Sequence, residues 1–444
     1  MKHAEDLVLS FLFEVSRNDS IYNVQEAIWN ARPEVVERRC DPAELVLYKL
    51  RPPEHPPTPS DYRKRQEAAL SEHTQKLDGT SRVSDCFAEY DPDLLVPILI
   101  GVTYVRRGSV VEDHILAVKR GVLAREPSSA AQYVHLLSEQ QKGPIKNGRP
   151  ADQSGLPLAI YHPVFAKFKD LCADQNIRPS ASENALAHQL FAVAASIYDD
   201  EDARFKGMQP TLEGLLNDAF DPETRVCNTR NTRCLLTETR SSGFALRAVV
   251  EVKNEIGTGL CDPSIEGGMY YRKYWVQPSM EPVLNACCCP SFVISVAGPW
   301  ICVLGAVFVD HVIVQPLTEY ISLGGEPDYE RRVSAVARIF HLLSGCMHDL
   351  NMFYGPLEVS DTLISSRLFP CFTCYSSGGT EVRLVYEYAL LGKAVFLALT
   401  QHGEAVVVKF TESYCKAAHL LLAEHGLAPP CGTANTLAAT CTWS

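Results

Sequence analysis

The chain has 444 residues, 46% of them hydrophobic, and a formal net charge of −12 at pH 7. This length exceeds what one ordinary hydrophobic core needs and predicts two or three domains. The negative charge excludes a chain that is basic over its whole surface, although it leaves room for a local basic groove.

The N-terminus does not have the pattern of a secretory signal. Its apolar stretch Phe11-Leu12-Phe13 is closely flanked by acids such as Asp6 and Glu14, which the core of a signal peptide does not contain. The 16 cysteines are therefore expected to be reduced thiols. The run Cys287-Cys288-Cys289 is interpreted as buried thiols rather than a metal cluster, because adjacent side chains point apart and no Cys-x-x-Cys pair completes a four-ligand site.

The first module is predicted to contain a helix, two strands and a second, charged helix. Their expected ranges are Val24–Ala31, Glu44–Leu50, Leu94–Val102 and Arg63–Ser71, with a proline-rich loop at 51–60. The strand with alternating leucines and the late second strand favour a small β-grasp module.

Two segments of this module resemble a known family. The strand Glu44–Leu50 and the stretch Leu77–Phe87 are similar to the ubiquitin-like header of Crinkler proteins, with Tyr48 in place of the usual tryptophan. The resemblance implies a degenerate ubiquitin-like module over 1–105, a protein partner bound through it, and a secreted effector acting in a host cell. The absent signal pattern favours the alternative, a protein of the cytoplasm or nucleus.

Residues 106–155 are predicted to be a linker. A short helix is expected at Gln132–Gln141, and the run from Lys142 to Pro150 is rich in glycine, proline and charge. Such breakers are typical of a hinge.

The central domain begins with two predicted helices and a β-hairpin. The helices are expected at Ser182–Asp199, capped by Ser180 or Ser182, and at Thr211–Ala219. The hairpin pairs Thr232–Thr239 with Phe244–Lys253 across a turn that contains a glycine. Its second strand is rich in β-branched residues.

Glu251 and Lys253 stand two residues apart on that strand and should project from one face. A carboxylate there can hold Mg²⁺, and a lysine can orient a water or stabilise charge on a phosphate. The alternative interpretation is a solvated edge strand.

The segment after this strand resembles part of a nuclease-like domain. A glycine-rich loop leads to Asp262-Pro263 and a helix ending at Trp275. The stretch Val249–Trp275 is similar to the restriction-endonuclease-like, PD-(D/E)XK domain of Crinkler-type and fungal kinase-associated proteins, and the resemblance extends over 156–357. It implies site roles for Glu266, which stands where the family has glutamine, and for Tyr270.

Such a nuclease needs a second metal-binding acid. Ideal hairpin pairing sets Glu251 opposite about Arg233, where no aspartate lies. Asp221 could enter if the following loop folds back, whereas Glu238 is too close to the turn. Glu183 is a further candidate metal ligand, although an exposed first-turn acid on a helix dipole is the favoured interpretation.

The local charge has the sign that a DNA partner requires. Residues 225–273 contain eight Lys or Arg and five Asp or Glu, a net +3 (8 − 5) inside a chain of −12. A solvated hairpin would give a similar count.

The apolar run 292–309 carries Gly298-Pro299 in its middle. We interpret it as two buried strands joined by a turn rather than as a membrane span.

The C-terminal segment predicts a small antiparallel sheet and a helix. Strands are expected at Leu384–Leu391, Lys393–Thr400 and Glu404–Phe410, and the helix at Ser413–His425. The strand around Lys409 resembles the small lobe of a fungal-type protein kinase, in which this lysine meets nucleotide phosphates. The lobe would span 380–430, with an aberrant tail at 431–444.

The sequence after this strand is too short for the rest of a kinase. Only 35 residues remain after Lys409 (444 − 409), far fewer than a catalytic lobe needs. ATP binding and phosphotransfer are therefore not expected.

The sequence thus predicts an α/β, multidomain, Crinkler-like effector or toxin with a nuclease-like centre. If active, it would cut DNA with Mg²⁺ at Glu251. The alternatives are a catalytically dead module that binds nucleic acid or protein, and an ATP-binding pseudokinase fragment.

Overall fold

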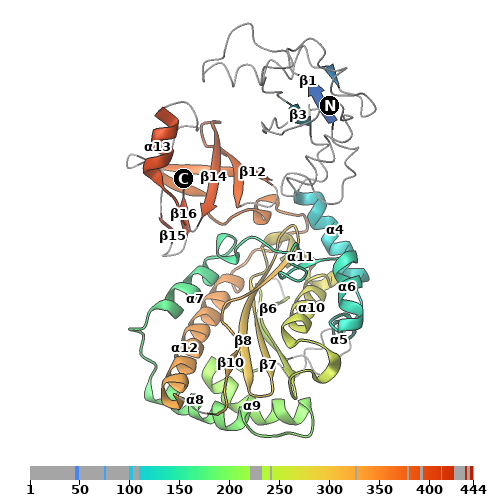
Figure 1. Cartoon of the computed structure of the whole chain (residues 1–444), viewed down its shortest axis with the longest axis vertical. Helices are drawn as coiled ribbons and strands as arrows, with labels where there is room; N and C mark the ends of the chain where they lie inside the picture. Colours follow the sequence, from blue (N-terminus) through green and yellow to red (C-terminus); the bar gives the residue numbers. More distant parts are fainter. Residues whose placement is uncertain are drawn as a thin grey trace, which may run out of the picture.

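The computed structural model describes residues 110–220, 233–240, 243–325, 328–377, 380–390, 394–411 and 413–424, with short strands at 46–49, 75–76, 100–103, 436–437 and 441–443. Within these residues, helices and strands are mixed, and the strands form three separate sheets (Figure 1). The predicted α/β class is confirmed at this level. The helices predicted at 24–31 and 63–71, and the candidate ligand Asp221, lie outside the described residues.

The central sheet has seven strands. In spatial order they are β4 (Ile145–Lys146), β9 (Val312–Pro316), β8 (Trp300–Phe308), β7 (Ser291–Ala297), β6 (Phe244–Lys253) and β5 (Arg233–Glu238), with β10 (Ile321–Ser322) paired to β8. β6 and β7 run parallel, so their connection must cross over the sheet. It does so through α10 (Pro263–Trp275) and α11 (Glu281–Ala286).

Helices cover both faces of this sheet (Figure 1). One layer contains α10 with α4 (Val110–Leu123), α5 (Pro127–Ala130) and α6 (Tyr133–Lys142). The other contains α7 (Pro163–Ala173), α8 (Ala181–Ala194), α9 (Glu201–Leu216) and α12 (Tyr329–Tyr354). The inner strands β6, β7 and β8 are accordingly buried along almost their whole length, which explains their continuous apolar sequences.

The predicted hairpin is confirmed, but its register differs by one residue. Arg233 pairs with Val250 rather than with Glu251. Next to the turn Glu238 pairs with Phe244, whereas the predicted pairing sets it opposite Leu246, and a bulge between Leu235 and Leu236 with one extra residue on β6 reduces this difference of two residues to one. Ideal pairing counted from the turn could not anticipate this extra residue.

The two predicted helices have different outcomes. Ser180, one of the two caps predicted for the first helix, caps α8 and forms a capping box with Glu183. The second helix was expected to start at Thr211, but α9 starts at Glu201 behind its cap Asp200 and contains Pro210 in its interior. A proline normally marks a helix start, and for this helix that rule gives the wrong boundary.

The expected linker is folded against the central sheet over its described part. Residues from Val110 form α4, α5 and α6, and β4 pairs in parallel with β9. His114 and Ile145 are buried, so this segment contributes to the core. The local glycines and prolines serve turns between short elements rather than a free hinge.

The apolar run at 292–309 forms the antiparallel pair β7 and β8, as predicted, with Gly298 at φ 56° in the turn. The three adjacent cysteines 287–289 are buried free thiols, also as predicted. None of the described helices combines the length and apolar character that crossing a membrane requires.

The C-terminal sheet contains the predicted strands. They are β12 (Thr380–Leu390), β13 (Val395–Thr400) and β14 (Ala405–Thr411), flanked by β11 (Cys374–Ser377), β16 (Cys441–Trp443) and β15 (Thr436–Leu437), and followed by α13 (Lys416–Glu424). Near the N-terminus, β1 (Val46–Lys49) pairs antiparallel with both β2 (Gln75–Lys76) and β3 (Ile100–Thr103).

Two buried histidines should make the fold sensitive to acid. Burial lowers the pKa of His114 and of His162 to about 4. Between pH 6.5 and 4 the unfolded chain binds protons that the folded chain does not, so stability falls as the pH falls through this range. Each histidine should contribute up to about 3 kcal/mol of this loss.

The check is urea unfolding at pH 7.5 and pH 4.5 for the wild type and His162→Asn. Asparagine retains a side-chain acceptor for the cap of α7, which His162 provides to the Val164 amide. The difference between the two pH values should shrink in this variant and stay unchanged in the exposed control His402→Asn. An unchanged difference in His162→Asn would refute the assignment.

Candidate functional site

The candidate site lies at the C-terminal end of β6. Glu251 and Lys253 are 3% and 5% exposed respectively, so the pair is not on a solvated edge. Both belong to a strand between two paired neighbours, β5 and β7. A buried acid and amine require partners.

The partner of Lys253 is a group of three carboxylates. Its ammonium nitrogen lies 2.8 Å from Glu266 Oε2 and 3.4 Å from Glu251 Oε1. It also lies 3.4 Å from Glu201 Oε1. We call these four residues the Lys253 cluster. If all were ionised, the cluster would carry −2 (three carboxylates and one ammonium).

Glu266 reaches the cluster because α10 packs very closely on the sheet. A Cβ at Gly267 would lie 2.5 Å from Val293 Cγ1, so only glycine permits this approach. Two consecutive glycines lower helix stability by about 1 kcal/mol each. Asp262 offsets part of this by capping the helix through the Ser264 amide, with Pro263 at its first position.

The loop between β6 and α10 covers the Lys253 ammonium. Gly259 has φ 72°, and a Cβ there would lie 3.4 Å from Lys253 Nζ. The Cys261 thiol donates to Glu266 Oε2 at 2.9 Å. Burial, and then this hydrogen bond, raise the pKa of Cys261, so the group is a protonated donor.

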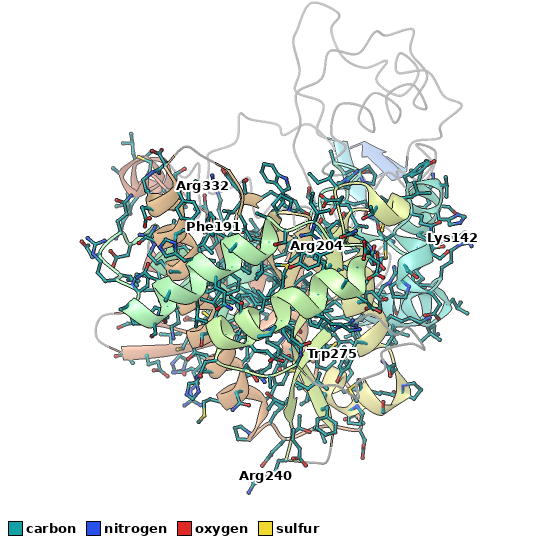
Figure 2. All side chains as sticks on the ribbon, turned by 90° about the horizontal axis from the view of Figure 1, so that it is seen from below. Lys142, Phe191, Arg204, Arg240, Trp275 and Arg332 are labelled. Carbon is teal, nitrogen blue, oxygen red and sulfur yellow. The ribbon has the colours of Figure 1, made fainter. Side chains whose placement is uncertain are left out.

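Glu201 enters from the first turn of α9. Arg204, one turn later and fully buried, fixes that helix to the end of β6. Its guanidinium donates to Asn254 Oδ1, to Glu255 Oε1 and to the carbonyl oxygens of Ala194 and Ser196, at 2.8–3.2 Å. Figure 2 shows Arg204 with α8 and α9, which lie side by side.

The cluster is short of positive charge. Burial first, and then the negative charge of Glu266, raise the pKa of Glu251 well above its usual value. Burial alone would lower the pKa of Lys253, but Glu251 and Glu266 outweigh it and raise that pKa. Glu251 Oε2 is buried and has no hydrogen-bond partner among the described residues. An added cation would stabilise this arrangement.

The donor chemistry fits Mg²⁺, which prefers carboxylate oxygens. Within the described residues, no three Asp, Glu, His or Cys side chains are spaced to hold a metal directly. The Lys253 ammonium lies between the carboxylates and contacts each of them.

The other predicted site residues lie in different places. Tyr270 is buried on α10, one turn after Glu266. Glu183 caps α8 and contacts His341 Nδ1 at 2.7 Å, so it serves the α8–α12 contact. Lys409 is exposed on β14.

Sequence reasoning missed two members of the site. Cys261 belongs to no recognisable motif. Glu201 had a signal, because Asp200 followed by two acids is a strong helix start, but the helix was expected ten residues later.

The comparisons with known proteins return nothing: no family model, no curated protein and no solved structure matches the chain.

Removal of the central amine should destabilise the protein in a pH-dependent way. Lys253→Met leaves the buried acids Glu251 and Glu266 and the partly exposed Glu201 without their cation, which should lower the free energy of unfolding by about 3–5 kcal/mol at pH 8. The loss should shrink toward pH 5, because the Glu251 carboxyl, whose pKa is raised, becomes protonated in the folded state as the pH falls.

Urea unfolding at both pH values measures this effect. The exposed Lys206 on α9 provides the matched control, since Lys206→Met should change stability by no more than about 0.5 kcal/mol. A loss for Lys253→Met that is equal at both pH values would contradict the proposed charge balance.

Proposed function

We propose that the central domain is a Mg²⁺-dependent nuclease that hydrolyses phosphodiester bonds in DNA. The Lys253 cluster carries this proposal: buried acids around one amine, with an unsatisfied oxygen on Glu251. Burying such charges costs stability, and ionisable groups with strongly shifted pKa values cluster at functional sites. Acids and an amine that meet at the end of one strand can bind a divalent cation and a phosphate.

Each residue of the cluster would have a distinct role. Glu251 would hold Mg²⁺ with a second acid, Glu266 or Asp221, and the bound ion would supply Lewis-acid polarisation and an acidified water. Lys253 would stabilise the negative charge that develops on the phosphate oxygens. The water oxygen bonds to phosphorus, one ester P–O bond breaks, and the departing oxygen takes up a proton.

Fewer basic side chains are available to contact DNA than the count over 225–273 suggested. Arg233 pairs with Asp202 at 2.8 Å, and Arg247 pairs with Asp218, so both serve the fold. Arg240 is exposed at the hairpin tip and projects from the body of the protein (Figure 2). The hairpin tip lies at the opposite end of β6 from the Lys253 cluster, about 30 Å away at the rise of a strand, so Arg240 would contact DNA away from the phosphate that is cleaved.

A binding module without cleavage activity is the second candidate. The observation in its favour is that the Lys253 ammonium already neutralises part of the cluster, with Glu266 in place of the family's glutamine. The pseudokinase gains no support, because Lys409 is exposed and the described residues show no carboxylate paired with it. The Crinkler resemblance, a protein partner of the ubiquitin-like module and secretion stay predictions.

Plasmid nicking tests the activity. Full-length protein with Mg²⁺ should convert supercoiled plasmid to the open circle, and Glu251→Gln and Lys253→Ala should reduce the rate about a hundredfold or more. Glu238→Gln changes an exposed acid on the neighbouring strand and should retain full activity. Mg²⁺-independent binding of DNA without nicking would select the binding module instead.

Metal binding provides a readout that does not depend on turnover. Ca²⁺ or Mg²⁺ at millimolar concentration should raise the Tm of the wild type, because a ligand that binds only the folded state stabilises it. The shift should be lost in Glu251→Gln and retained in Glu238→Gln. An equal shift in all three proteins would exclude Glu251 as a ligand.

A further inference from the structure

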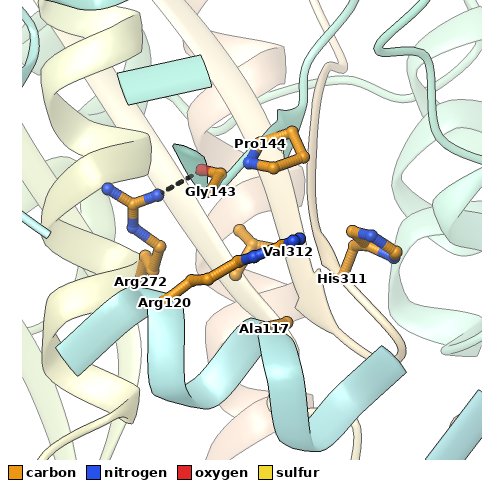
Figure 3. A pocket seen from close by; sticks show the side chains of 7 residues that line it. All are labelled: Ala117, Arg120, Gly143, Pro144, Arg272, His311 and Val312. Atoms are coloured by element: carbon orange, nitrogen blue, oxygen red, sulfur yellow. Dashed lines mark hydrogen bonds between the residues drawn. The ribbon is translucent and has the colours of Figure 1, made fainter. Parts of the chain in front are cut away.

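A second polar site lies in the helical layer that contains α10. The ends of α4 and α6 meet the last turns of α10 around a cavity of about 450 Å³. Its lining residues are Arg120, Leu123, Ala124, Arg125, Glu139, Lys142, Gly143 and Arg272. A smaller recess continues from it past Arg120, Gly143 and Arg272 toward His311 and Val312 (Figure 3).

The lining is strongly cationic. Four of its side chains are Arg or Lys and one is an acid, a net +3 (4 − 1), in a chain of −12. The acid, Glu139, is bound by Arg125 Nε at 3.1 Å. The lining thus contains more cations than acids, which would attract an anion into the cavity.

Arg272 forms the buried base of the site. It is 3% exposed, and Nη1 donates to the Gly143 carbonyl oxygen at 2.7 Å, as Figure 3 shows. Nη2 contacts the Met269 sulfur at 3.2 Å. Nε is buried with no hydrogen-bond partner among the described residues.

The hydrogen bonds described for Arg272 go to a carbonyl oxygen and a sulfur, and none goes to an anion. Buried arginines are usually paired with a carboxylate or phosphate, which uses their planar set of donors. Burial lowers the pKa of Arg272 to about 10, which reflects the cost of keeping the charge out of water.

The backbone geometry keeps the cationic side chains of the lining close together. A Cβ at Gly121 would lie 2.7 Å from Val276 Cγ1, and a Cβ at Gly143 would lie 3.1 Å from Arg120 Cβ. Gly121 lets α4 approach the end of α10, and Gly143 lets the end of α6 approach α4. Arg120 and Arg272 thereby line both the cavity and its recess.

We propose that this cavity binds the phosphate group of a small phosphorylated molecule, held by Arg120, Lys142 and Arg272. A phosphate offers several acceptor oxygens and up to two negative charges, matching a lining with net charge +3. The volume suits a small ligand. The proposal does not depend on the nuclease activity, because it uses none of the Lys253 cluster.

Calorimetric titration of the full chain with inorganic pyrophosphate and with ADP, without divalent cations, tests the proposal. Arg120→Gln and Lys142→Gln should each weaken binding at least tenfold. Lys119→Gln is the matched control, since Lys119 is an exposed cation on α4 outside the lining, and its affinity should equal that of the wild type.

The variants separate this site from the others. Glu251→Gln should leave pyrophosphate binding unchanged even if it abolishes nicking, so the two proposals can fail independently. Lys409→Ala should leave ADP binding unchanged; its loss there would transfer the nucleotide to the C-terminal sheet and overturn the proposal for ADP.

Three results would each overturn the phosphate site. The first is that neither probe at about 10 mM releases heat or changes the Tm. The second is equal affinity in Arg120→Gln and Lys119→Gln, and the third is that the protein binds only duplex DNA and the two cavity variants weaken that binding. The last result would assign the cations to a nucleic-acid backbone.

Discussion

The contact on which the central domain depends is that between the Lys253 ammonium and the three carboxylates of Glu201, Glu251 and Glu266. An amine and acids at this depth are costly singly, and the amine in particular is stable there only because the acids surround it. Each acid comes from a different element, so the cluster also fixes α9 and α10 to the end of β6. The side chains that carry the proposed activity therefore also hold the fold together.

Close packing makes this contact geometrically feasible. Gly267 brings α10 against β7, which carries Glu266 over the strand end, while Arg204 fixes α9 through two carbonyl oxygens and two side chains. The same helix α10 bears Arg272 about two turns later, at the cationic cavity. One helix thus presents an acid to the C-terminal end of β6 and a guanidinium to the outer helical layer.

Sequence reasoning worked well where local patterns decide the outcome. The β-branched strand Phe244–Lys253, the apolar pair around Gly298 and the helix after Asp262-Pro263 all form as predicted. It failed where tertiary contacts override local signals. Pro210 lies inside a helix that begins at Glu201, and the presumed linker supplies β4 to the central sheet.

By itself, the sequence determined that Glu251 and Lys253 share a face of a strand, because side chains in a strand alternate with a period of two. The start at Asp262-Pro263 also predicted the helix that carries Glu266, whereas a site role for Glu266 was implied only by the resemblance. Only the tertiary structure decided that this face is buried, that Glu201 joins it from a helix fifty residues earlier, and that Glu183 does not serve there but caps α8. Those facts depend on packing between distant segments, whose geometry a local pattern does not contain.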